Sequence, residues 1–244
     1  MASLLDVRGV SKRFGGLSAV RDVTFSVEEG ETVGVIGPNG AGKTTLFSLV
    51  TGFLRPDAGE IRFRDRTVTD LAPERRCHLG LCRTFQLVKP FGNLSVLQNV
   101  MIGALTRVPS VERARGVAEE IIERCRLGPY RDAAGKSLPL GLRKRLEVAR
   151  ALATEPKLLL LDEVMSGLNP AELREMLDLV RELHAGGLSL LVIEHIMAVI
   201  MPLSQRVVVL HHGEKLAEGP PAEVARDRRV IDAYLGEEFA VAEA

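Results

Sequence analysis

Short, continuous apolar runs alternate along this chain with segments of helical periodicity. Such runs are typical of strands that are buried on both faces of a parallel sheet. They occur at residues 32–36, 158–161, 188–193 and 206–210. Because the segments between them are long enough to cross from one strand to the next, the pattern predicts an α/β fold with a parallel sheet in its core.

Alternating apolar and polar positions near the start of the chain predict antiparallel strands as well. The segments with this pattern are residues 4–12, 19–27 and 59–68, and a further short strand is expected at 79–86. The first two flank the turn Phe14-Gly15-Gly16, so we expect them to pair directly. The strands at 4–12, 19–27 and 59–68 are predicted to form an antiparallel sheet along one side of the parallel core.

Helical signals dominate the middle of the chain. Ser95 and Gln98 form a capping box, and residues 114–127 carry an apolar stripe opposite charged positions. A helix is predicted at 141–154, and another begins where Asn169 can act as N-cap. We therefore expect one domain over 1–244, with a core at 1–87 and 156–219, a helical subdomain at 88–155 and a helical tail at 220–244.

A glycine-rich stretch joins the first apolar run to a helical segment that begins at Lys43. Gly37, Gly42, Lys43 and Thr44 fit G-x-x-x-x-G-K-[ST], the spacing of the phosphate-binding P-loop. In such a loop the backbone N–H groups and the helix dipole bind a phosphate, the lysine reaches the β- and γ-phosphates, and the threonine hydroxyl binds Mg²⁺. The predicted phosphate-binding residues are Gly37, Pro38, Asn39, Gly40, Ala41, Gly42, Lys43, Thr44 and Thr45. The alternative is a glycine-rich turn that only caps a buried helix.

Two consecutive carboxylates end the strand of four leucines at 158–161. Asp162 and Glu163 are thereby expected at the carboxyl edge of the sheet, where α/β proteins bind ligands. Asp162 is predicted to bind Mg²⁺ opposite Thr44, and Glu163 to accept a proton from the attacking water as general base. The alternative is a solvated acidic loop after a core strand.

Composition excludes several other classes of protein. The 244 residues carry equal numbers of acidic and basic side chains, which argues against a nucleic-acid-binding surface as the main feature. Cys77, Cys82 and Cys125 form neither a disulfide framework nor a zinc motif and are expected to be buried thiols. The opening segment lacks a long apolar core, and charged and polar residues interrupt the most apolar region, so we expect no secretory signal and no membrane span.

Taken in order, these and other motifs resemble those of the ATP-binding cassette (ABC) ATPases over nearly the whole chain. Gln86 stands at the position of the family's Q-loop, residues 166–169 (SGLN) resemble its D-loop, and His195 resembles its switch histidine. The resemblance implies that Gln86 contacts Mg²⁺ and the attacking water, that His195 touches the γ-phosphate, and that Phe14 stacks on adenine. Taken alone, His195 and Phe14 are better explained by structural roles and Gln86 indicates almost nothing, so the order of the motifs carries the interpretation.

The family's signature motif, normally S-G-G-Q after a leucine, reads LPLGL at residues 138–142. Pro139 offers neither a hydroxyl nor an N–H group, whereas the Gly141 amide and the helix N-terminus remain able to bind a phosphate. The resemblance implies that Pro139 and Gly141 contact the nucleotide of a second cassette. Val164 also replaces the proline that commonly follows the catalytic glutamate.

Three longer runs resemble the importer ATPases for branched-chain amino acids, at residues 80–105, 149–172 and 218–238. This resemblance implies an ATPase on the cytoplasmic face of the inner or plasma membrane, whose cassette dimer closes on ATP and drives permease subunits. Its partners would be a second ABC ATPase subunit, integral-membrane permeases and, indirectly, an extracytoplasmic solute-binding protein, with no nucleic acid. The alternatives are a soluble ABC ATPase that acts on nucleic acid or ribosomes, and a small nucleotide kinase.

Overall fold

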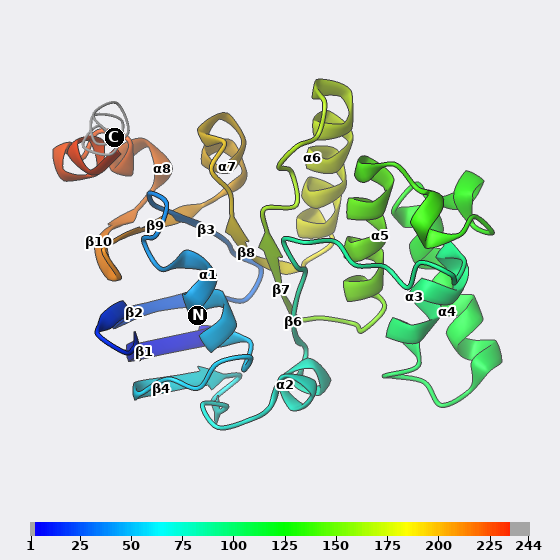
Figure 1. Cartoon of the computed structure of the whole chain (residues 1–244), viewed down its shortest axis with the longest axis horizontal. Helices are drawn as coiled ribbons and strands as arrows, with labels where there is room; N and C mark the ends of the chain where they lie inside the picture. Colours follow the sequence, from blue (N-terminus) through cyan, green and yellow to red (C-terminus); the bar gives the residue numbers. More distant parts are fainter. Residues whose placement is uncertain (1–2, 235–244) are drawn as a thin grey trace. The chain divides into compact units, whose positions relative to one another are not determined.

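The computed structural model describes residues 3–234 and divides into two compact units (Figure 1). The first unit comprises Met1–Arg76 together with Ser189–Ala244, and the second comprises Cys77–Leu188. The boundaries predicted from the sequence, with a helical subdomain at 88–155, differ from those of these two units and stay a prediction. Within the described residues, no helix combines the length and the apolarity that crossing a membrane requires.

A four-stranded antiparallel sheet in the first unit begins the chain. Its strands follow the order β2-β1-β4-β5 and are β1 (Ser3–Phe14), β2 (Leu17–Glu28), β4 (Ala58–Phe63) and β5 (Arg66–Thr67). The predicted pairing of the first two strands is confirmed. The prediction of one strand at 59–68 is wrong, because Arg64 and Asp65 adopt φ values of 50° and 60° and turn the chain into a hairpin.

The first unit also contains strands with parallel pairing. They follow the order β10-β9-β3-β8 and are β3 (Thr32–Ile36), β8 (Ser189–Ile193), β9 (Arg206–His211) and β10 (Glu214–Gly219). β3 pairs in parallel with both β8 and β9, whereas β10 is antiparallel to β9. All residues of β3 and β8 are buried, which explains their uninterrupted apolar sequences.

The helices of the first unit are short. They are α1 (Lys43–Val50), α7 (Met197–Leu203) and α8 (Pro221–Val224). The sequence did not predict α7 or β10. The seven residues of α7, which include Pro202, form too few turns for a clear helical period. α8 lies in the predicted helical tail, and the part of that tail at 235–244 lies outside the described residues.

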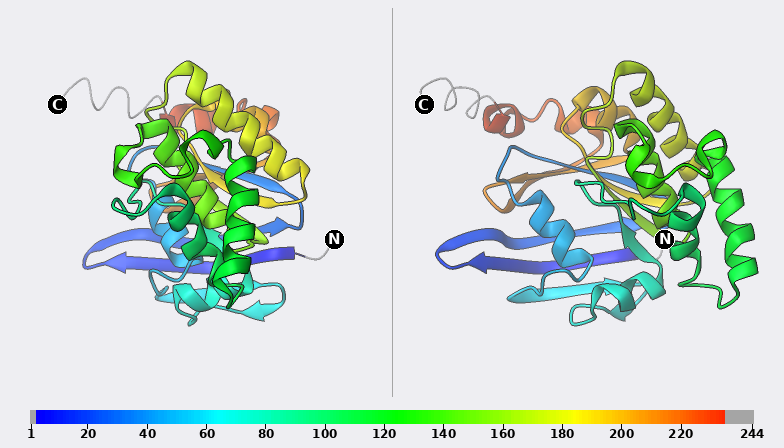
Figure 2. Two further views of the ribbon diagram at one scale, coloured as in Figure 1. Left: turned by 90° about the vertical axis from the view of Figure 1, so that its right-hand side faces the viewer. Right: turned by 45° about the vertical axis from the view of Figure 1, so that its right-hand side comes forward.

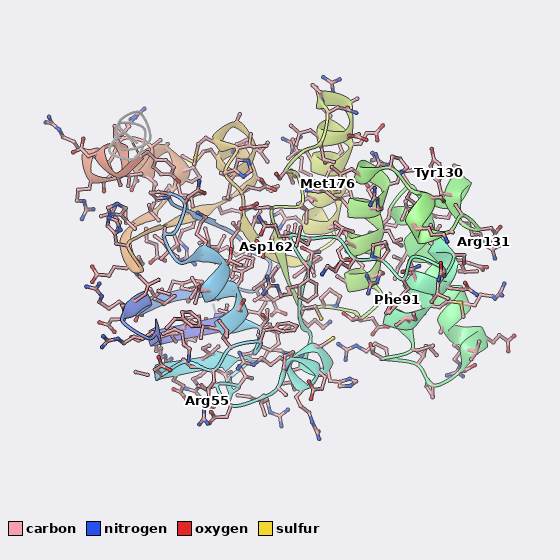
Figure 3. The ribbon with its side chains drawn as sticks, in the orientation of Figure 1. Arg55, Phe91, Tyr130, Arg131, Asp162 and Met176 are labelled. Carbon is pink, nitrogen blue, oxygen red and sulfur yellow. The ribbon has the colours of Figure 1, made fainter. Side chains whose placement is uncertain are left out.

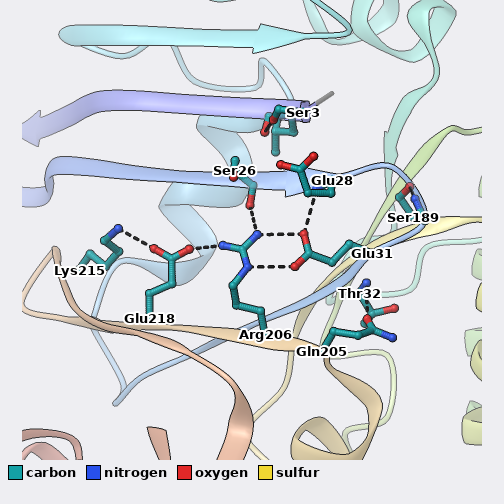
Figure 4. Close-up of polar contacts among 12 residues, drawn as sticks. Ser3, Ser26, Glu28, Glu31, Thr32, Ser189, Gln205, Arg206, Lys215 and Glu218 are labelled. Carbon is teal, nitrogen blue, oxygen red and sulfur yellow. Dashed lines mark hydrogen bonds and ion pairs between the residues drawn. The ribbon is translucent and has the colours of Figure 1, made fainter. Parts of the chain in front are cut away.

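An arginine on β9 links both sheets of the first unit (Figure 4). Arg206 donates to both carboxylate oxygens of Glu31 at 2.9 Å and to the carbonyl oxygen of Ser26 at 2.7 Å. It also pairs with Glu218 of β10, which accepts a hydrogen bond from Lys215 at 2.6 Å. A planar guanidinium group can make several such contacts at once. The contacts of Arg206 therefore hold β9 and β10 against the end of β2.

The second unit combines two parallel strands with the longer helices. Its elements are β6 (Leu81–Arg83), β7 (Leu158–Asp162), α3 (Val96–Ala104), α4 (Val111–Arg124), α5 (Leu140–Leu152), α6 (Pro170–Ala185), and the 3₁₀ turns Gly128–Tyr130 and Gly135–Ser137. α3 packs against both α4 and α5, and Figure 2 shows these helices side by side. α2 (Pro73–Leu79) leads into this unit from the first.

The capping chemistry predicted for two of these helices is confirmed. Ser95 and Gln98 cap α3 reciprocally, and Asn169 and Glu172 do the same for α6. The strand predicted at 79–86 is only three residues long, because α2 occupies its first position and the chain leaves the sheet after Arg83.

Candidate functional site

The glycine-rich loop of the first unit lies between the carboxyl end of β3 and the start of α1. Gly37 has φ 149°, and a Cβ atom there would stand 2.1 Å from the Leu210 carbonyl oxygen. Gly42 has φ 100°, and a Cβ atom there would stand 2.3 Å from the Ala19 carbonyl oxygen. Both positions therefore exclude any side chain, by backbone conformation and by close packing.

The N-terminus of α1 has the properties of an anion site. Its N-cap is Gly42, no side chain caps the helix, and no acidic residue lies in the first turn. The Lys43 side chain is 9% exposed, and its Nζ donates to the carbonyl oxygens of Gly37 at 2.5 Å and Pro38 at 2.7 Å. Because the backbone donors of the loop, the dipole of α1 and the Lys43 ammonium group lie together, this loop fits a phosphate chain.

Two further predicted residues, Phe14 and His195, belong to the first unit. Phe14 ends β1, is 46% exposed, and has the Lys12 ammonium 5.9 Å from its ring centroid. The neighbouring strand β2 contacts the loop at Ala19. His195 is exposed two residues beyond β8, which runs parallel to β3 with Ile193 beside Val35. His195 is therefore placed at the edge of the sheet that carries the loop, whereas Phe14 belongs to the antiparallel sheet, whose strand β2 reaches the loop.

The acidic pair belongs to the second unit: Asp162 is the last residue of β7 (Figure 3), and Glu163 follows it directly. Asp162 is 1% exposed, and one of its carboxylate oxygens accepts a hydrogen bond from Arg83 at 2.6 Å. Burial lowers the pKa of Arg83, and the Asp162 carboxylate opposes that change. Arg83 ends β6, which runs parallel to β7, so a cation and a carboxylate meet where both strands leave the sheet.

Glu163 turns away from the strand and contacts two other elements. Its φ of 49° ends the extended backbone, and one carboxylate oxygen accepts a hydrogen bond from Gln86 Nε2 at 2.7 Å. Its carbonyl oxygen accepts from Lys144 Nζ at 2.9 Å, and the same ammonium donates to the Ser166 carbonyl oxygen at 2.5 Å. The loop after β7 is therefore held by α5, while the Glu163 carboxylate faces the segment after β6.

The signature segment forms the N-terminus of α5. Pro139 is the N-cap, without a side-chain cap, and Gly141 is buried against α6. A Cβ atom at Gly141 would lie 2.5 Å from a carboxylate oxygen of Glu172. Glycine at this position is thus required by packing within the unit.

The donors that the sequence predicts for Mg²⁺ fit that ion by type. They are the hydroxyl of Thr44, the amide oxygen of Gln86 and the carboxylate of Asp162, all hard oxygen ligands. Within residues 3–234 no three His, Cys, Asp or Glu side chains gather as a metal site. Mg²⁺ commonly takes only one or two protein carboxylates and fills its other positions with phosphate oxygens and water, so this donor set suits a metal that arrives with a nucleotide.

The sequence did not single out Arg83 or Lys144. Arg83 could have been recognised as a candidate site residue, since it is a basic residue at the end of a short strand and three positions before Gln86. Lys144 carried no such signal, because a lysine on a helix is usually a solvated side chain. Its 5% exposure is a property of the packing alone.

Comparison with known proteins agrees with this geometry. The family model described as ABC transporter matches residues 20–166, and one described as branched-chain amino acid ATP-binding cassette transporter matches residues 214–240. The first match spans both the loop and the acidic pair. The fold and the site together define a P-loop nucleotide-hydrolysing protein, and the chain belongs to the ABC transporter family as an ATPase.

Individual relatives extend over nearly the full length of this chain. The high-affinity branched-chain amino acid transport ATP-binding protein LivG of Escherichia coli is 38% identical and covers 96% of this chain and 98% of its own. The lipopolysaccharide export system ATP-binding protein LptB of Acidithiobacillus ferridurans is 36% identical, with 99% and 100% covered. A solved ATP-binding cassette in its ADP conformation superposes with a TM-score of 0.87 at 31% identity, covering 97% and 100%.

Proposed function

We propose that this chain is the ATP-hydrolysing subunit of an importer for branched-chain amino acids or related amino acids and amides. Two cassettes close around two ATP molecules, and closure changes the conformation of membrane permeases that receive solute from an extracytoplasmic binding protein. The hydrogen bond between Gln86 and Glu163 carries the hydrolytic part of this proposal. The similarity to LivG over nearly the whole chain supports the class of solute.

The first unit binds the nucleotide. Backbone N–H groups of residues 37–45 and the dipole of α1 bind the β- and γ-phosphates. Lys43 exchanges the carbonyl oxygens of its own loop for phosphate oxygens, which costs little because both are hydrogen-bond acceptors. Phe14 stacks on adenine through its exposed ring, and His195 contacts the γ-phosphate.

The second unit supplies the base. The Glu163 carboxylate accepts the proton of the attacking water, and Gln86 orients both the carboxylate and that water. Thr44, Gln86 and Asp162 would hold Mg²⁺, which when bound would neutralise charge on the phosphates. Arg83 directs the Asp162 carboxylate through their ion pair of 2.6 Å.

The signature segment acts on the nucleotide of a second cassette. Pro139 cannot donate a hydrogen bond, so the N-terminus of α5 and its backbone at Gly141 make this contact. The partner cassette is a copy of this chain or a paralogue.

The segment after Gln86 contacts the permease, starting with residues 90–94. Exposed apolar side chains support this assignment, since Leu87 and Phe91 are 72% and 45% exposed. Exposed large apolar side chains close together in the sequence are typical of a protein interface. The subunit would thus be peripheral, at the cytoplasmic face of the inner or plasma membrane.

The variant Glu163→Gln tests the assignment of the base. Glutamine keeps the shape of the side chain but cannot accept a proton, so ATP binding is expected to persist while steady-state phosphate release falls by orders of magnitude. Nucleotide binding by a fluorescent ATP analogue separates the two effects. Normal turnover in this variant would remove Glu163 from its role.

Purification from native membranes tests the transport assignment. Two apolar permease subunits and a second cassette are expected to accompany this chain, and leucine uptake is expected to depend on it. Co-purification with lipopolysaccharide-export components would favour the alternative that LptB represents. A salt-sensitive complex with RNA or DNA would instead support a soluble ABC ATPase of nucleic acid.

A further inference from the structure

Two cysteine side chains of the second unit meet beside the turn between α2 and β6. Cys77 lies on α2 and Cys82 on β6, and Gly80, with φ 101°, reverses the chain between them. Their sulfur atoms are 3.4 Å apart. Cys77 is half-buried, whereas Cys82 is 6% exposed. Since a disulfide bond is about 2.0 Å long, the two sulfur atoms need to approach each other by about 1.4 Å to form one.

An arginine and a threonine hold the two cysteines in place. Arg107 donates to the carbonyl oxygens of Cys77 at 2.8 Å, His78 at 2.7 Å and Thr154 at 2.5 Å. The Thr154 hydroxyl lies 2.9 Å from the Cys82 sulfur. One cation thereby ties the end of α2 to the chain after α5, and the dithiol is a built feature of this unit.

The surroundings make the two thiols chemically unequal. The hydrogen bond from Cys82 lowers the pKa of Cys77, with smaller contributions from Thr154 and the positive charge of Arg107. The same hydrogen bond and burial raise the pKa of Cys82. A thiolate is the reactive form of cysteine, so the more exposed sulfur is also the better nucleophile.

We propose that Cys77 and Cys82 form a hydroperoxide-reactive dithiol, with Cys77 as the attacking thiolate and Cys82 as the resolving thiol. The Cys77 sulfur attacks one oxygen of a hydroperoxide such as hydrogen peroxide. An S–O bond forms, the O–O bond breaks, and the leaving hydroxide takes a proton to become water. The Cys82 sulfur then attacks the Cys77 sulfenic acid, so the S–S bond forms while the S–O bond breaks. Its thiol proton leaves with that oxygen as a second water molecule.

This site is separate from the nucleotide chemistry proposed above, because the cysteine side chains bond to each other and to Thr154, none of which has a role in that chemistry. A metal does not account for the pair either, since no third His, Cys, Asp or Glu ligand joins it within residues 3–234. The third cysteine, Cys125, offers an internal comparison, because its side chain is fully buried and burial raises its pKa to about 12.

Peptide mapping of the purified full chain tests the proposal directly. Trypsin cleaves after Arg76 and Arg83 and releases both cysteines in one peptide, residues 77–83. After treatment with hydrogen peroxide and then an alkylating reagent, this peptide is expected to carry no alkyl group. Its mass is expected to be two hydrogen atoms below that of the same peptide with two free thiols. Dithiothreitol is expected to restore both alkylation sites, while Cys125 stays alkylatable after unfolding. A peptide that keeps two free thiols, or a Cys125 that oxidises as fast, would overturn the proposal.

Serine variants test the order of attack. Cys82→Ser is expected to accumulate a sulfenic acid on Cys77 that a cyclic dione traps, whereas Cys77→Ser leaves Cys82 unlabelled. The variant Cys125→Ser is the matched control and is expected to form the disulfide as the unmodified chain does. Equal trapping on Cys82 in Cys77→Ser would contradict the assigned roles. The peptide map uses the chain without substitutions, so it tests the proposal even if a serine variant fails to fold.

Discussion

The ammonium group of Lys144 connects the helix of the signature segment to the loop that carries Glu163. Its two hydrogen bonds, at 2.9 Å and 2.5 Å, come from a side chain that is 5% exposed. Hydrogen bonds to a charged group contribute about 1.5–3 kcal/mol each. The variant Lys144→Met keeps the length of the side chain and removes both bonds, and it also removes the cost of burying a charge. We expect a net loss of about 2 kcal/mol in the free energy of unfolding.

We expect Lys144→Met to lower the rate of ATP hydrolysis as well as the stability. Without Lys144 the Glu163 carbonyl loses its donor, so the loop relaxes and moves the carboxylate. A displacement of about 1 Å at a reacting group costs about a hundredfold in rate, so we expect kcat to fall by about 10- to 100-fold. The KM for ATP is expected to change little, because the ATP-binding loop belongs to the other unit.

Steady-state phosphate release and urea unfolding, measured on the same preparation, separate the two effects. Lys144→Arg keeps a cation in reach of both carbonyl groups and is expected to recover much of kcat. Arg143→Met removes a cation one position earlier on α5 and serves as the matched control. A Lys144→Met variant with the expected loss of stability but unchanged kcat would refute the inference that this contact positions Glu163.

Three further predictions concern individual side chains. Arg76 donates to four carbonyl oxygens, including the last ones of α1, so Arg76→Met is expected to cost about 3–5 kcal/mol in urea unfolding, and a loss below about 1 kcal/mol would contradict this. Burial raises the pKa of Glu147 above its ordinary value of 4.5, so the folded chain binds the Glu147 proton more tightly than the unfolded chain. At pH values above 4.5 the ionised Glu147 carboxylate therefore lowers the free energy of unfolding. Glu147→Gln is therefore expected to raise the melting temperature at pH 8, by an amount that shrinks towards pH 4.5; a constant difference would argue against this cause. Gly42→Ala is expected to abolish binding of a fluorescent ATP analogue, since a Cβ atom would stand 2.3 Å from a carbonyl oxygen. Retained binding would show that the loop backbone can shift.

Several features of this protein follow from the sequence without its structure. The P-loop and the acidic pair are recognisable because glycine conformation, helix dipoles and strand ends act over a few residues. The caps at Ser95 and Asn169 were predictable for the same reason, since each satisfies donors within its own first turn. Continuous apolar runs likewise indicated which strands are buried on both faces.

Only the tertiary structure revealed the contacts that orient the acidic pair. Arg83 and Asp162 are separated by 79 positions, and Gln86 and Glu163 by 77, so no local pattern relates them. The burial of Lys144 depends on how α5 packs against the loop after β7, and the meeting of Cys77 and Cys82 depends on a left-handed turn at Gly80. Local chemistry in the sequence thus determined which groups are present, whereas long-range packing decided which of them touch, because side chains distant in the chain meet only after the strands and helices have packed.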